Sequence, residues 1–309
     1  MLERRQNPVG RAATASIPRI SLGGLRLAVL DMEATASFMI DAVRPRRRTG
    51  RPLFLTSANG EVLARCSTEP QTERVFRAAD LINADGQPLV TVSRLKSRTP
   101  LPERVATTDL FHVVARKAQA AGLSFYMLGA DEEENTAAVA RIRQTYPRLR
   151  ILGRCHGYLK GDELRAKVDE INRLAPDYLW VALGVPYEQV FVAEFMPLLS
   201  NVGVIKTSGG LFNFLSGSRA RAALDAAGRA GMGLSDMAGA AAPVLALSHH
   251  QSPCALSAAA PGRTARSQAF AQLGLTCNPY GRARYRRRMP SAPRWRAMFD
   301  ELGAPAAEC

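Results

Sequence analysis

The sequence predicts an α/β fold, Rossmann-like, in which helices flank a mostly parallel sheet. From about Leu25 to Leu215, short apolar runs alternate with amphipathic stretches, which is the pattern of repeated βα units. The run Asp177–Gly184 (DYLWVALG) is almost entirely apolar, as expected of a central strand covered on both faces. No internal repeat is evident, so we expect one α/β domain over residues 24–222.

Seven apolar runs are the predicted strands. They are Leu25–Leu30, Leu53–Thr56, Leu81–Asn83, Ser124–Leu128, Ile151–Gly153, Tyr178–Leu183 and Gly203–Lys206. Amphipathic helices are expected between them. The clearest is Glu132–Tyr146, whose apolar residues recur at helical spacing and which Pro147 ends. A second spans Gly161–Leu174 and is closed by Pro176.

Composition excludes several classes of protein. The chain has 309 residues, of which 47% are hydrophobic and 22% charged, which is ordinary for a globular protein. No stretch is long and apolar enough to span a bilayer, and the polar start lacks the apolar core of a secretory signal. Five cysteines form no CxxC pair, so we expect free thiols and a cytoplasmic protein.

The formal charge of +14 favours an anionic partner, either nucleic acid or a membrane surface. The chain has only five lysines, so most of the 41 basic residues are arginine, as is common in proteins from GC-rich genomes. The run Arg44–Arg51 (RPRRRTGR) is interpreted as a solvated loop or as a contact with anionic lipid or a phosphate-bearing substrate. It contains no aromatic residue for base stacking, so we do not expect a nucleic acid partner.

Ligands of open parallel sheets bind at the carboxyl ends of the strands. Polar residues and glycines that follow a predicted strand are therefore candidates. They are Ser57 and Asn59 in TSAN, Asp85 in NADG, Gly129, Gly184, and Thr207, Ser208, Gly209 and Gly210 in TSGG. The TSGG turn precedes an apolar helical start, so its backbone N–H groups are suited to a diphosphate, with the two hydroxyls as further donors. A plain tight turn is the alternative.

Asp85 is the best candidate for a general base, since a carboxylate in such a turn can face a cleft and accept a hydroxyl proton. An Asx turn or a helix cap is the alternative role. His156 in CHGY is a weaker candidate base and is more typical of a hydrogen-bonded structural residue. Glu188 and Gln189 follow a strand and open a helix, where an acid and an amide are also ordinary first-turn residues.

Several motifs are absent from the sequence, namely GxGxxG after the first strand, GxxxxGK[ST], GxSxG, HExxH and DxD. Their absence argues against dehydrogenases, P-loop proteins, esterases, zinc proteases and metal-dependent sugar transferases.

Six motifs in register, from about Leu25 to Arg221, resemble the WecG/TagA/CpsF glycosyltransferases, family 26. They are TSANGEVL (56–63), NADGQPLV (83–90), ERV with TTDL (103–110), YPRLRILGRCHGY (146–158), PDYLWVALGVPYEQ (176–189) and GVIKTSGGLFNFLSG (203–217). The resemblance implies an inverting transfer from a UDP-sugar to a polyprenyl-diphosphate-linked saccharide at the cytoplasmic membrane surface. It implies neither a metal nor a cofactor.

The resemblance also implies roles for residues. Asp85 corresponds to the proposed base, and Ser57 and Asn59 to the turn that lines the same pocket. Arg94 and Arg104 follow the NADG turn and are also expected to bind substrate. The TSGG turn would hold the leaving diphosphate while Asp85 deprotonates the acceptor hydroxyl.

The chain departs from the family pattern at several positions. Ser57 replaces the usual Thr and keeps the hydroxyl, while Glu188 and Gln189 stand where many members have Gln and then Glu. Asn213 replaces a common Asp. Because of these changes, the donor is expected to be either UDP-N-acetylmannosamine or, as in the exopolysaccharide branch of the family, UDP-glucose or UDP-glucuronate.

The largest departure follows Ala222, where the family's Trp- and Arg-rich appendage is missing. If the segment after Ala222 is back-translated with GC-rich codons and read one nucleotide later, the resulting sequence can encode such an appendage. We therefore expect a frameshift near Arg221 to Ala223, with residues 223–309 as an out-of-frame tail and residues 1–23 as a basic arm. The alternative function is a non-catalytic nucleotide-sugar-binding or basic nucleic-acid-binding module, inactive as a transferase because the appendage is lost. A homo-oligomer is left open.

Overall fold

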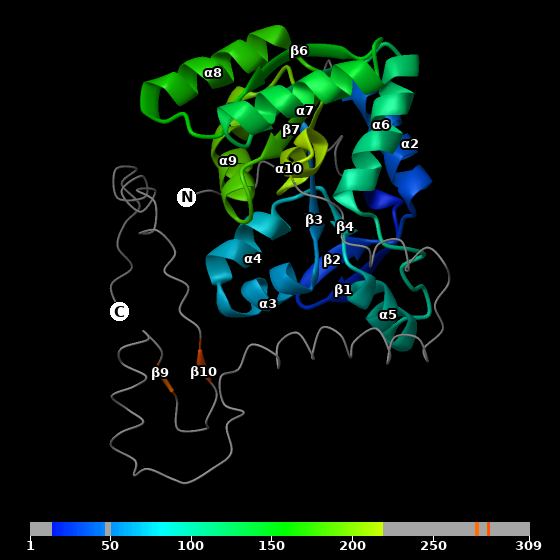
Figure 1. Ribbon diagram of the computed structural model, residues 1–309. Coiled ribbons are helices and arrows are strands. Elements are labelled where there is room, and N and C mark those ends of the chain that lie inside the picture. The colour runs from blue at the N-terminus through cyan, green and yellow to red at the C-terminus, as the bar shows by residue number, and fades with distance from the viewer. Residues whose placement is uncertain (1–13, 47–50, 219–275, 278–282, 285–309) are drawn as a thin grey trace, which may run out of the picture. The chain divides into compact units, whose positions relative to one another are not determined.

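The structure is a computed structural model that describes residues 14–46, 51–218, 276–277 and 283–284 (Figure 1). The chain divides into two compact units, Met1–Asp225 and Ala226–Cys309. In the second unit the described residues form two short strands, β9 (Thr276–Cys277) and β10 (Ala283–Arg284), which pair antiparallel. Most of the predicted out-of-frame tail, 223–309, and the first 13 residues of the predicted basic arm lie outside the described residues.

The first unit is built on a six-stranded sheet whose paired neighbours are all parallel, in the order β4-β3-β8-β7-β5-β6. The strands are β3 (Leu53–Ala58), β4 (Leu81–Ala84), β5 (Ser124–Gly129), β6 (Arg150–Cys155), β7 (Tyr178–Ala182) and β8 (Val204–Thr207). All five residues of β7 are buried, and the strand lies between β8 and β5. The predicted α/β class and the central position of this apolar run are confirmed.

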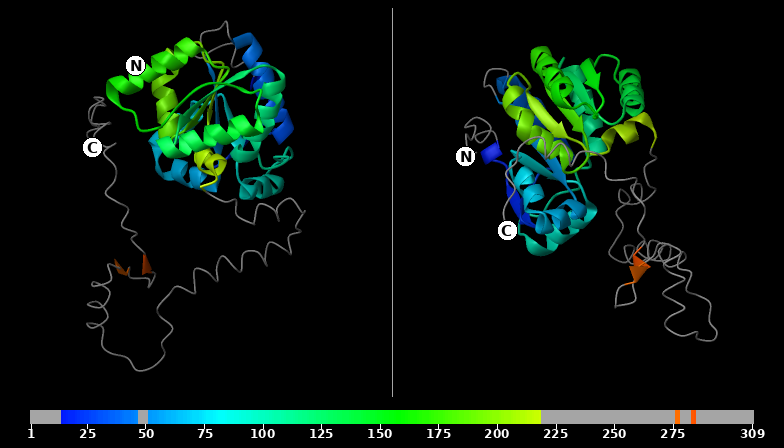
Figure 2. Two further views of the ribbon diagram at one scale, coloured as in Figure 1. Left: turned by 45° about the horizontal axis from the view of Figure 1, so that its top comes forward. Right: turned by 90° about the vertical axis from the view of Figure 1, so that its left-hand side faces the viewer.

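Helices cover both faces of the sheet (Figures 1 and 2). One face packs against α2 (Met32–Arg46), α6 (Thr107–Ala120), α7 (Glu132–Thr145) and α10 (Leu211–Ser216). The other packs against α8 (Gly161–Leu174) and α9 (Tyr187–Phe195), which continues into the short turn η1 (Met196–Leu198). Side chains alternate along a strand, so neighbouring residues of one strand serve these two different layers.

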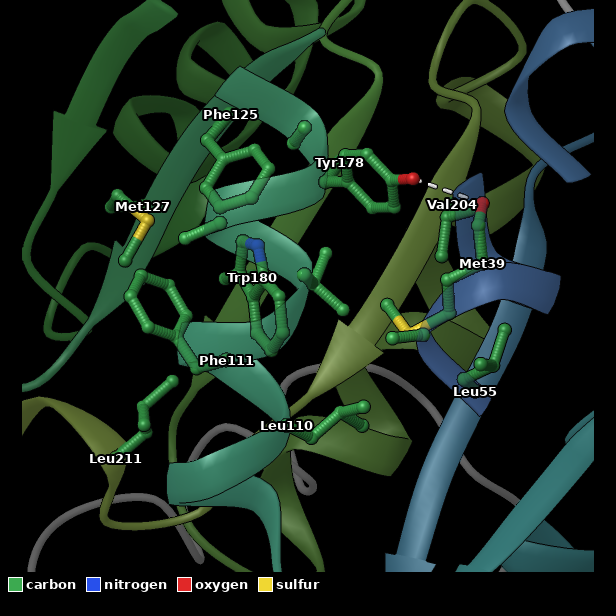
Figure 3. Packing of buried hydrophobic residues seen from close by; sticks show 14 of the residues in the cluster. Met39, Leu55, Leu110, Phe111, Phe125, Met127, Tyr178, Trp180, Val204 and Leu211 are labelled. Carbon is green, nitrogen blue, oxygen red and sulfur yellow. Dashed lines mark hydrogen bonds between the residues drawn. The ribbon is translucent and has the colours of Figure 1, made fainter. Parts of the chain in front are cut away.

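Aromatic side chains fill the layer between the sheet and α6 (Figure 3). The rings of Phe111 on α6 and Trp180 on β7 meet edge to face with centroids 4.9 Å apart. The phenol of Tyr178 donates a hydrogen bond of 2.9 Å to the backbone carbonyl of Met39 on α2. Its burial raises the pKa of the Tyr178 phenol far above the usual range, so it acts only as a neutral donor that fixes α2 on the sheet.

A hairpin and three helices form a third layer, beside the edge strand β4. Strands β1 (Arg19–Leu22) and β2 (Leu25–Ala28) pair antiparallel and share a core with α3 (Gly60–Thr68), α4 (Pro70–Arg77) and α5 (Gln87–Lys96). Gly23 and Gly24 join the strands with φ of 53° and 82°, as a two-residue turn of the I′ kind requires.

The hairpin corrects two expectations. The strand expected at Leu25–Leu30 exists but belongs to the hairpin rather than to the parallel sheet, because its partner is the preceding strand. That partner, Arg19–Leu22, lies within the expected basic arm 1–23, so the folded region begins before residue 24.

The loop expected at Arg44–Arg51 is also partly helical. Helix α2 runs to Arg46 because Ala42 and Val43 are buried against the core, so the last turn has an apolar anchor. Residues 47–50 lie outside the described residues. Cys66 and Cys155 are buried free thiols, as expected, and burial raises the pKa of both. No helix in the described ranges has the length and apolar character needed to cross a membrane.

Candidate active site

The carboxyl ends of β3, β4 and β8 and the start of α9 enclose a cavity of about 210 Å³. Eight of the residues expected to form the site line it. They are Ser57, Asn59, Asp85, Glu188, Thr207, Ser208, Gly209 and Gly210. Six further residues that were not singled out from the sequence also line it, namely Val62, Thr107, Thr108, Val185, Leu211 and Phe214.

Asp85 is held at the rim by the first residue of α6. Its Oδ2 accepts hydrogen bonds of 3.0 Å from both the backbone N–H and the hydroxyl of Thr107. Arg104 adds a longer ion pair, with 3.7 Å between its Nε and Oδ1. The carboxylate thus caps α6 and gains from the positive end of the helix dipole. The side chain is still 29% exposed, so the capping role and access for a substrate coexist.

A chain of hydrogen bonds links Asp85 to a buried cation. The Nζ of Lys206 donates to the Ser57 hydroxyl at 3.0 Å, and that hydroxyl lies 3.1 Å from the hydroxyl of Thr107. An ammonium can only donate and a carboxylate can only accept, so both hydroxyl protons point from Lys206 toward Asp85. Bonds oriented in one direction polarise and strengthen one another.

Lys206 is fully buried at the end of β8 and also donates to the carbonyl of Thr207 at 2.7 Å. Burial lowers the pKa of Lys206 to about 8, although the carboxylates of Glu188 and Asp85 favour its charged form. Sequence reasoning missed Lys206 as well as Thr107. The available signal was a lysine ending an apolar strand directly before TSGG, in a chain with few lysines.

Glu188 is only 2% exposed and occupies the glycine turn. Its Oε2 accepts the backbone N–H of Gly209 at 2.8 Å and that of Ser208 at 3.3 Å. Burial raises the pKa of Glu188, while these N–H groups and Lys206 act in the opposite direction. Its role therefore differs from that of an ordinary first-turn acid, which faces solvent.

The donors expected for a diphosphate are engaged within the protein. Besides the two N–H groups on Glu188, the Ser208 hydroxyl donates to the carbonyl of Val181 at 2.8 Å. The hydroxyls of Thr207 and Thr56 are 2.7 Å apart. Within the turn, the Gly209 N–H thus already holds an anion, the Glu188 side chain, while the Ser208 N–H also donates to the carbonyl of Val181 at 2.8 Å.

Gln189 lies beneath the cavity rather than on its wall. It is fully buried, and its Nε2 donates to the hydroxyls of Thr56 at 3.0 Å and Thr207 at 3.4 Å. Its Oε1 has no hydrogen-bond partner within the described part of the chain. Asn59, by contrast, lines the cavity and caps α3, since its Oδ1 accepts the N–H of Val62 at 2.9 Å.

Strand alternation explains why the polar residues form two groups. Leu55 of β3 lies opposite Lys206 of β8, so Ser57 and Lys206 share the face that packs against α6. The next residues, Thr56 and Thr207, share the face that packs against α9. The residues linked to Asp85 and those linked to Gln189 therefore lie on opposite faces of the sheet. They meet at the cavity, where Thr207 and Glu188 line the same space as Asp85.

Besides Gln189 and Arg104, four residues singled out from the sequence lie outside the cavity lining. Arg94 is exposed on α5. A side chain at Gly129 would place its Cβ 2.2 Å from the carbonyl oxygen of Ala182, so this glycine permits close packing of β5 on β7. Gly184, with φ of 79°, turns the chain after β7. His156 accepts the N–H of Tyr158 through Nδ1 at 3.2 Å, as its structural interpretation predicts. Within the described ranges, no cluster of three His, Cys, Asp or Glu could hold a metal ion.

Comparison with known proteins agrees with the resemblance noted in the sequence. The model of the glycosyl transferase WecG/TagA/CpsF family matches residues 20–226. Several curated relatives are named N-acetylglucosaminyldiphosphoundecaprenol N-acetyl-beta-D-mannosaminyltransferase. The one from Bacillus spizizenii is 31% identical over 169 residues, which is 55% of this chain and 64% of the relative. The one from Bacillus subtilis is 29% identical over 168 residues, covering 54% and 64%.

A third relative with the same name, from Staphylococcus aureus, is 28% identical over 171 residues, covering 55% of this chain and 65% of the relative. The chain thus spans slightly less than two thirds of the length of these relatives. The matched family region includes every residue that lines the cavity.

Proposed function

Because this chain belongs to the WecG/TagA/CpsF family of glycosyl transferases, we propose that it transfers a sugar from a UDP-sugar to a saccharide linked to polyprenyl diphosphate. The observation that carries the proposal is the position of Asp85. Its carboxylate opens on the cavity, while Thr107 and Arg104 hold it from the protein side. A partly exposed carboxylate with a fixed orientation is suited to accept a proton from a bound hydroxyl.

In the proposed step, Asp85 accepts the proton of the acceptor hydroxyl as its oxygen attacks the anomeric carbon. The new C–O bond forms on the face opposite the bond to the diphosphate, which breaks and leaves with its electron pair on UDP. In-line attack inverts the anomeric centre. The polarised chain from Lys206 through Ser57 and Thr107 keeps Oδ2 of Asp85 in place, so that Oδ1 faces the acceptor beside Arg104.

The leaving diphosphate is proposed to bind at the TSGG turn. The N–H of Gly209 already holds one carboxylate, that of Glu188, and the N–H of Ser208 is shared between this carboxylate at 3.3 Å and the carbonyl of Val181 at 2.8 Å, so the turn can accommodate an anionic oxygen. A diphosphate that takes this position displaces Glu188. The raised pKa of Glu188 favours the neutral form, which lowers the electrostatic cost of an adjacent diphosphate.

The names of the relatives suggest N-acetylmannosamine as the transferred sugar and a diphosphoundecaprenol-linked N-acetylglucosamine as the acceptor. Asn213 and the order Glu188–Gln189 depart from the family pattern, so UDP-glucose and UDP-glucuronate are proposed as alternative donors. The reaction is proposed to need no metal and to take place at the inner face of the plasma membrane, in synthesis of exopolysaccharide or another surface polysaccharide.

The test is a transfer assay with the full chain, the three UDP-sugars and a short-chain polyprenyl-diphosphate sugar, each with and without a chelator. We expect one donor to be used, with inversion at the anomeric carbon and no loss of rate with the chelator. Binding of UDP without transfer from any donor would contradict the proposed enzyme and favour a binding module.

We also propose that the reading frame changes near Arg221 to Ala223. The family match ends at residue 226, close to the point where the expected appendage is missing. Sequencing the genomic DNA across codons 215–290 tests this. A one-base correction that restores a Trp- and Arg-rich segment supports it, and the corrected chain should then be assayed beside the present one. An unchanged frame refutes it.

A further inference from the structure

A second cavity lies at the opposite ends of β3 and β4 from the candidate active site. Its volume is about 1020 Å³, and Arg51 and Asp80, which precede β3 and β4, are on its wall. The outer face of the β1–β2 hairpin supplies Arg19 and Arg26, and the last residue of α4 supplies Arg77. Four guanidinium groups from three parts of the fold thus face one cavity, and among the described residues that line it Asp80 is the single acid.

Two of the four arginines already have a counter-charge. Arg51 holds Asp80 through bonds of 3.0 and 2.8 Å to its two carboxylate oxygens, and Asp80 also accepts the backbone N–H of Phe54 at 2.8 Å. Arg77 pairs with Glu73 at 2.7 Å and donates to the carbonyl of Gly24 at 3.1 Å. These contacts fix the two side chains as part of the cavity wall.

The other two, Arg19 and Arg26, form no ion pair with any residue that the structure describes, although the nearby Asp80 carboxylate favours the charged form of Arg19. Arg19 is anchored through Nη2 to two carbonyls, those of Asp80 at 2.9 Å and Thr14 at 3.4 Å, which leaves its other N–H donors available. Arg26 makes no hydrogen bond or ion pair with any described residue.

Arg19 and Arg26 are also neighbours. Ser21 lies opposite Arg26 and Arg19 lies opposite Ala28 in the hairpin, so the two arginines are diagonal neighbours on its outer face. Like charges in this relation repel, and burial together with Arg26 lowers the pKa of Arg19. The hairpin therefore bears two neighbouring cations, neither held in an ion pair with a described residue, and an anion would stabilise them.

We propose that this arginine cavity, defined by Arg19, Arg26, Arg51 and Arg77, binds a phosphate group. Guanidinium forks match the geometry of phosphate oxygens and bind them in bidentate fashion. The cavity has room for a larger molecule around the phosphate, so the ligand is either a soluble phosphorylated compound or the headgroup of an anionic phospholipid. Arg51, the last residue of the arginine run noted in the sequence, is part of it.

This site is separate from the proposed donor site. The six residues of β3 lie between the two cavities, which at about 3.3 Å per residue puts them roughly 20 Å apart. A ligand in the arginine cavity can therefore be bound while the other cavity is occupied. The proposal does not depend on the reaction proposed above.

The experiment compares the full-length chain with three variants. Arg26→Gln removes the unpartnered charge, and Arg26→Lys keeps the charge but loses the fork. Arg165→Gln removes an equal charge from an exposed position on α8 and is the matched control. Arg26 anchors no described residue, so its variants are expected to fold. Calorimetric titration with inorganic phosphate and pyrophosphate measures a soluble ligand, and sedimentation with phosphatidylcholine vesicles, with and without phosphatidylglycerol, measures a lipid headgroup.

We expect Arg26→Gln to weaken binding about tenfold, the value of one charge-assisted hydrogen bond, with Arg26→Lys intermediate and Arg165→Gln near wild type. A loss seen with the phosphates identifies a soluble ligand, and a loss seen only with phosphatidylglycerol vesicles identifies a headgroup. Equal losses in Arg26→Gln and Arg165→Gln would show a general effect of net charge and overturn the proposal. The proposal would also be overturned if none of the probes binds, or if the Arg26 variants bind as tightly as wild type.

Discussion

One oxygen of the Glu188 carboxylate accepts the backbone N–H of Gly209 at 2.8 Å, in the turn where a ligand anion was expected. The two residues come from different elements, α9 and the segment between β8 and α10. Because Glu188 is almost completely buried, the contact is shielded from water and its charge state matters. Any diphosphate that uses this turn competes with Glu188.

The variant Glu188→Gln keeps an acceptor oxygen for the turn and removes the charge. At pH values above the raised pKa of Glu188, we expect the variant to bind UDP more tightly than wild type, by up to about tenfold, because an ionised carboxylate repels the diphosphate. Burial raises the pKa of Glu188, so the advantage should shrink as pH falls through that pKa and the wild-type acid becomes neutral. Titration calorimetry from pH 5.5 to 8 measures this, with Glu163→Gln on the exposed face of α8 as the control. Equal affinities at every pH would place the diphosphate elsewhere.

Asp85→Asn tests the proposed base. The amide can still accept the N–H of Thr107, so the cap of α6 is kept while proton acceptance is lost. We expect the transfer rate to fall about 10²- to 10⁴-fold, the usual contribution of a general base, with UDP affinity within a few-fold of wild type. Rate assays and calorimetry on the same preparation check both quantities. Transfer that survives the change intact would rule out this role.

Lys206→Met tests the buried cation through the pH dependence of stability. The pKa of Lys206 is about 8 in the folded chain and 10.5 when unperturbed, so between these values the unfolded state holds the extra proton. The free energy of unfolding of wild type should therefore rise relative to the variant from pH 8 to pH 10.5, by at most about 1.4 kcal/mol per pH unit. Below pH 8 the difference should be constant.

Urea denaturation at pH 7, 8, 9 and 10 measures this difference for Lys206→Met. Lys160→Met, at an exposed lysine, is the control and should show no such slope. A flat difference for Lys206→Met would mean that the ammonium keeps its proton throughout this range.

Thr107 joins Ser57 to Asp85 through its hydroxyl, and a pair of variants isolates that group. Thr107→Val keeps the shape and the backbone N–H on Asp85 but breaks the chain from Lys206. We expect kcat to fall about tenfold, as for the loss of one hydrogen bond to a charged group, with KM little changed. Thr107→Ser restores the hydroxyl and should restore kcat. Equal rates for the Val and Ser variants would refute a positioning role.

Gly129→Ala tests packing at the carboxyl end of β5. The added Cβ would lie 2.2 Å from the carbonyl oxygen of Ala182, and φ is 137°, so the strands must separate. We expect a loss of at least about 3 kcal/mol in the free energy of unfolding, from overpacking and backbone strain together. Gly122→Ala, with φ of 67° but open space around it, should lose about 1 kcal/mol. Similar losses in the free energy of unfolding for the two variants would mean that the ends of β5 and β7 can separate at little cost.

Local patterns were sufficient to predict the elements of the fold. The periodicity of Gly161–Leu174 and the prolines after Leu174 and Tyr146 marked two helices, since both signals depend on nearby residues. The pairing of Leu25–Ala28 with Arg19–Leu22 was not predicted, because an apolar run does not reveal which strand lies beside it. The Gly23–Gly24 turn was the overlooked signal.

The candidate site was predicted only where residues follow a strand. Asp85 and Ser57 met that rule, and both line the cavity. Thr107 comes from the start of a helix and reaches Asp85 only through the tertiary fold. Lys206 was read as the end of an apolar strand, because the sequence does not show that its ammonium finds a hydroxyl partner in Ser57. The capture of the glycine turn by Glu188 likewise depends on the packing of α9.

The alternation of β3 has a consequence for how this family of sites can diversify. Thr56 and Ser57 are adjacent in the chain but point into opposite layers, as do Lys206 and Thr207. Substitutions on the α9 side that leave Glu188 in place can reshape the part of the site around Gln189 without touching the hydroxyls that link Lys206 to Asp85. The two faces of the strand thus offer separate positions for substitution, one around Gln189 and one around the groups that contact Asp85.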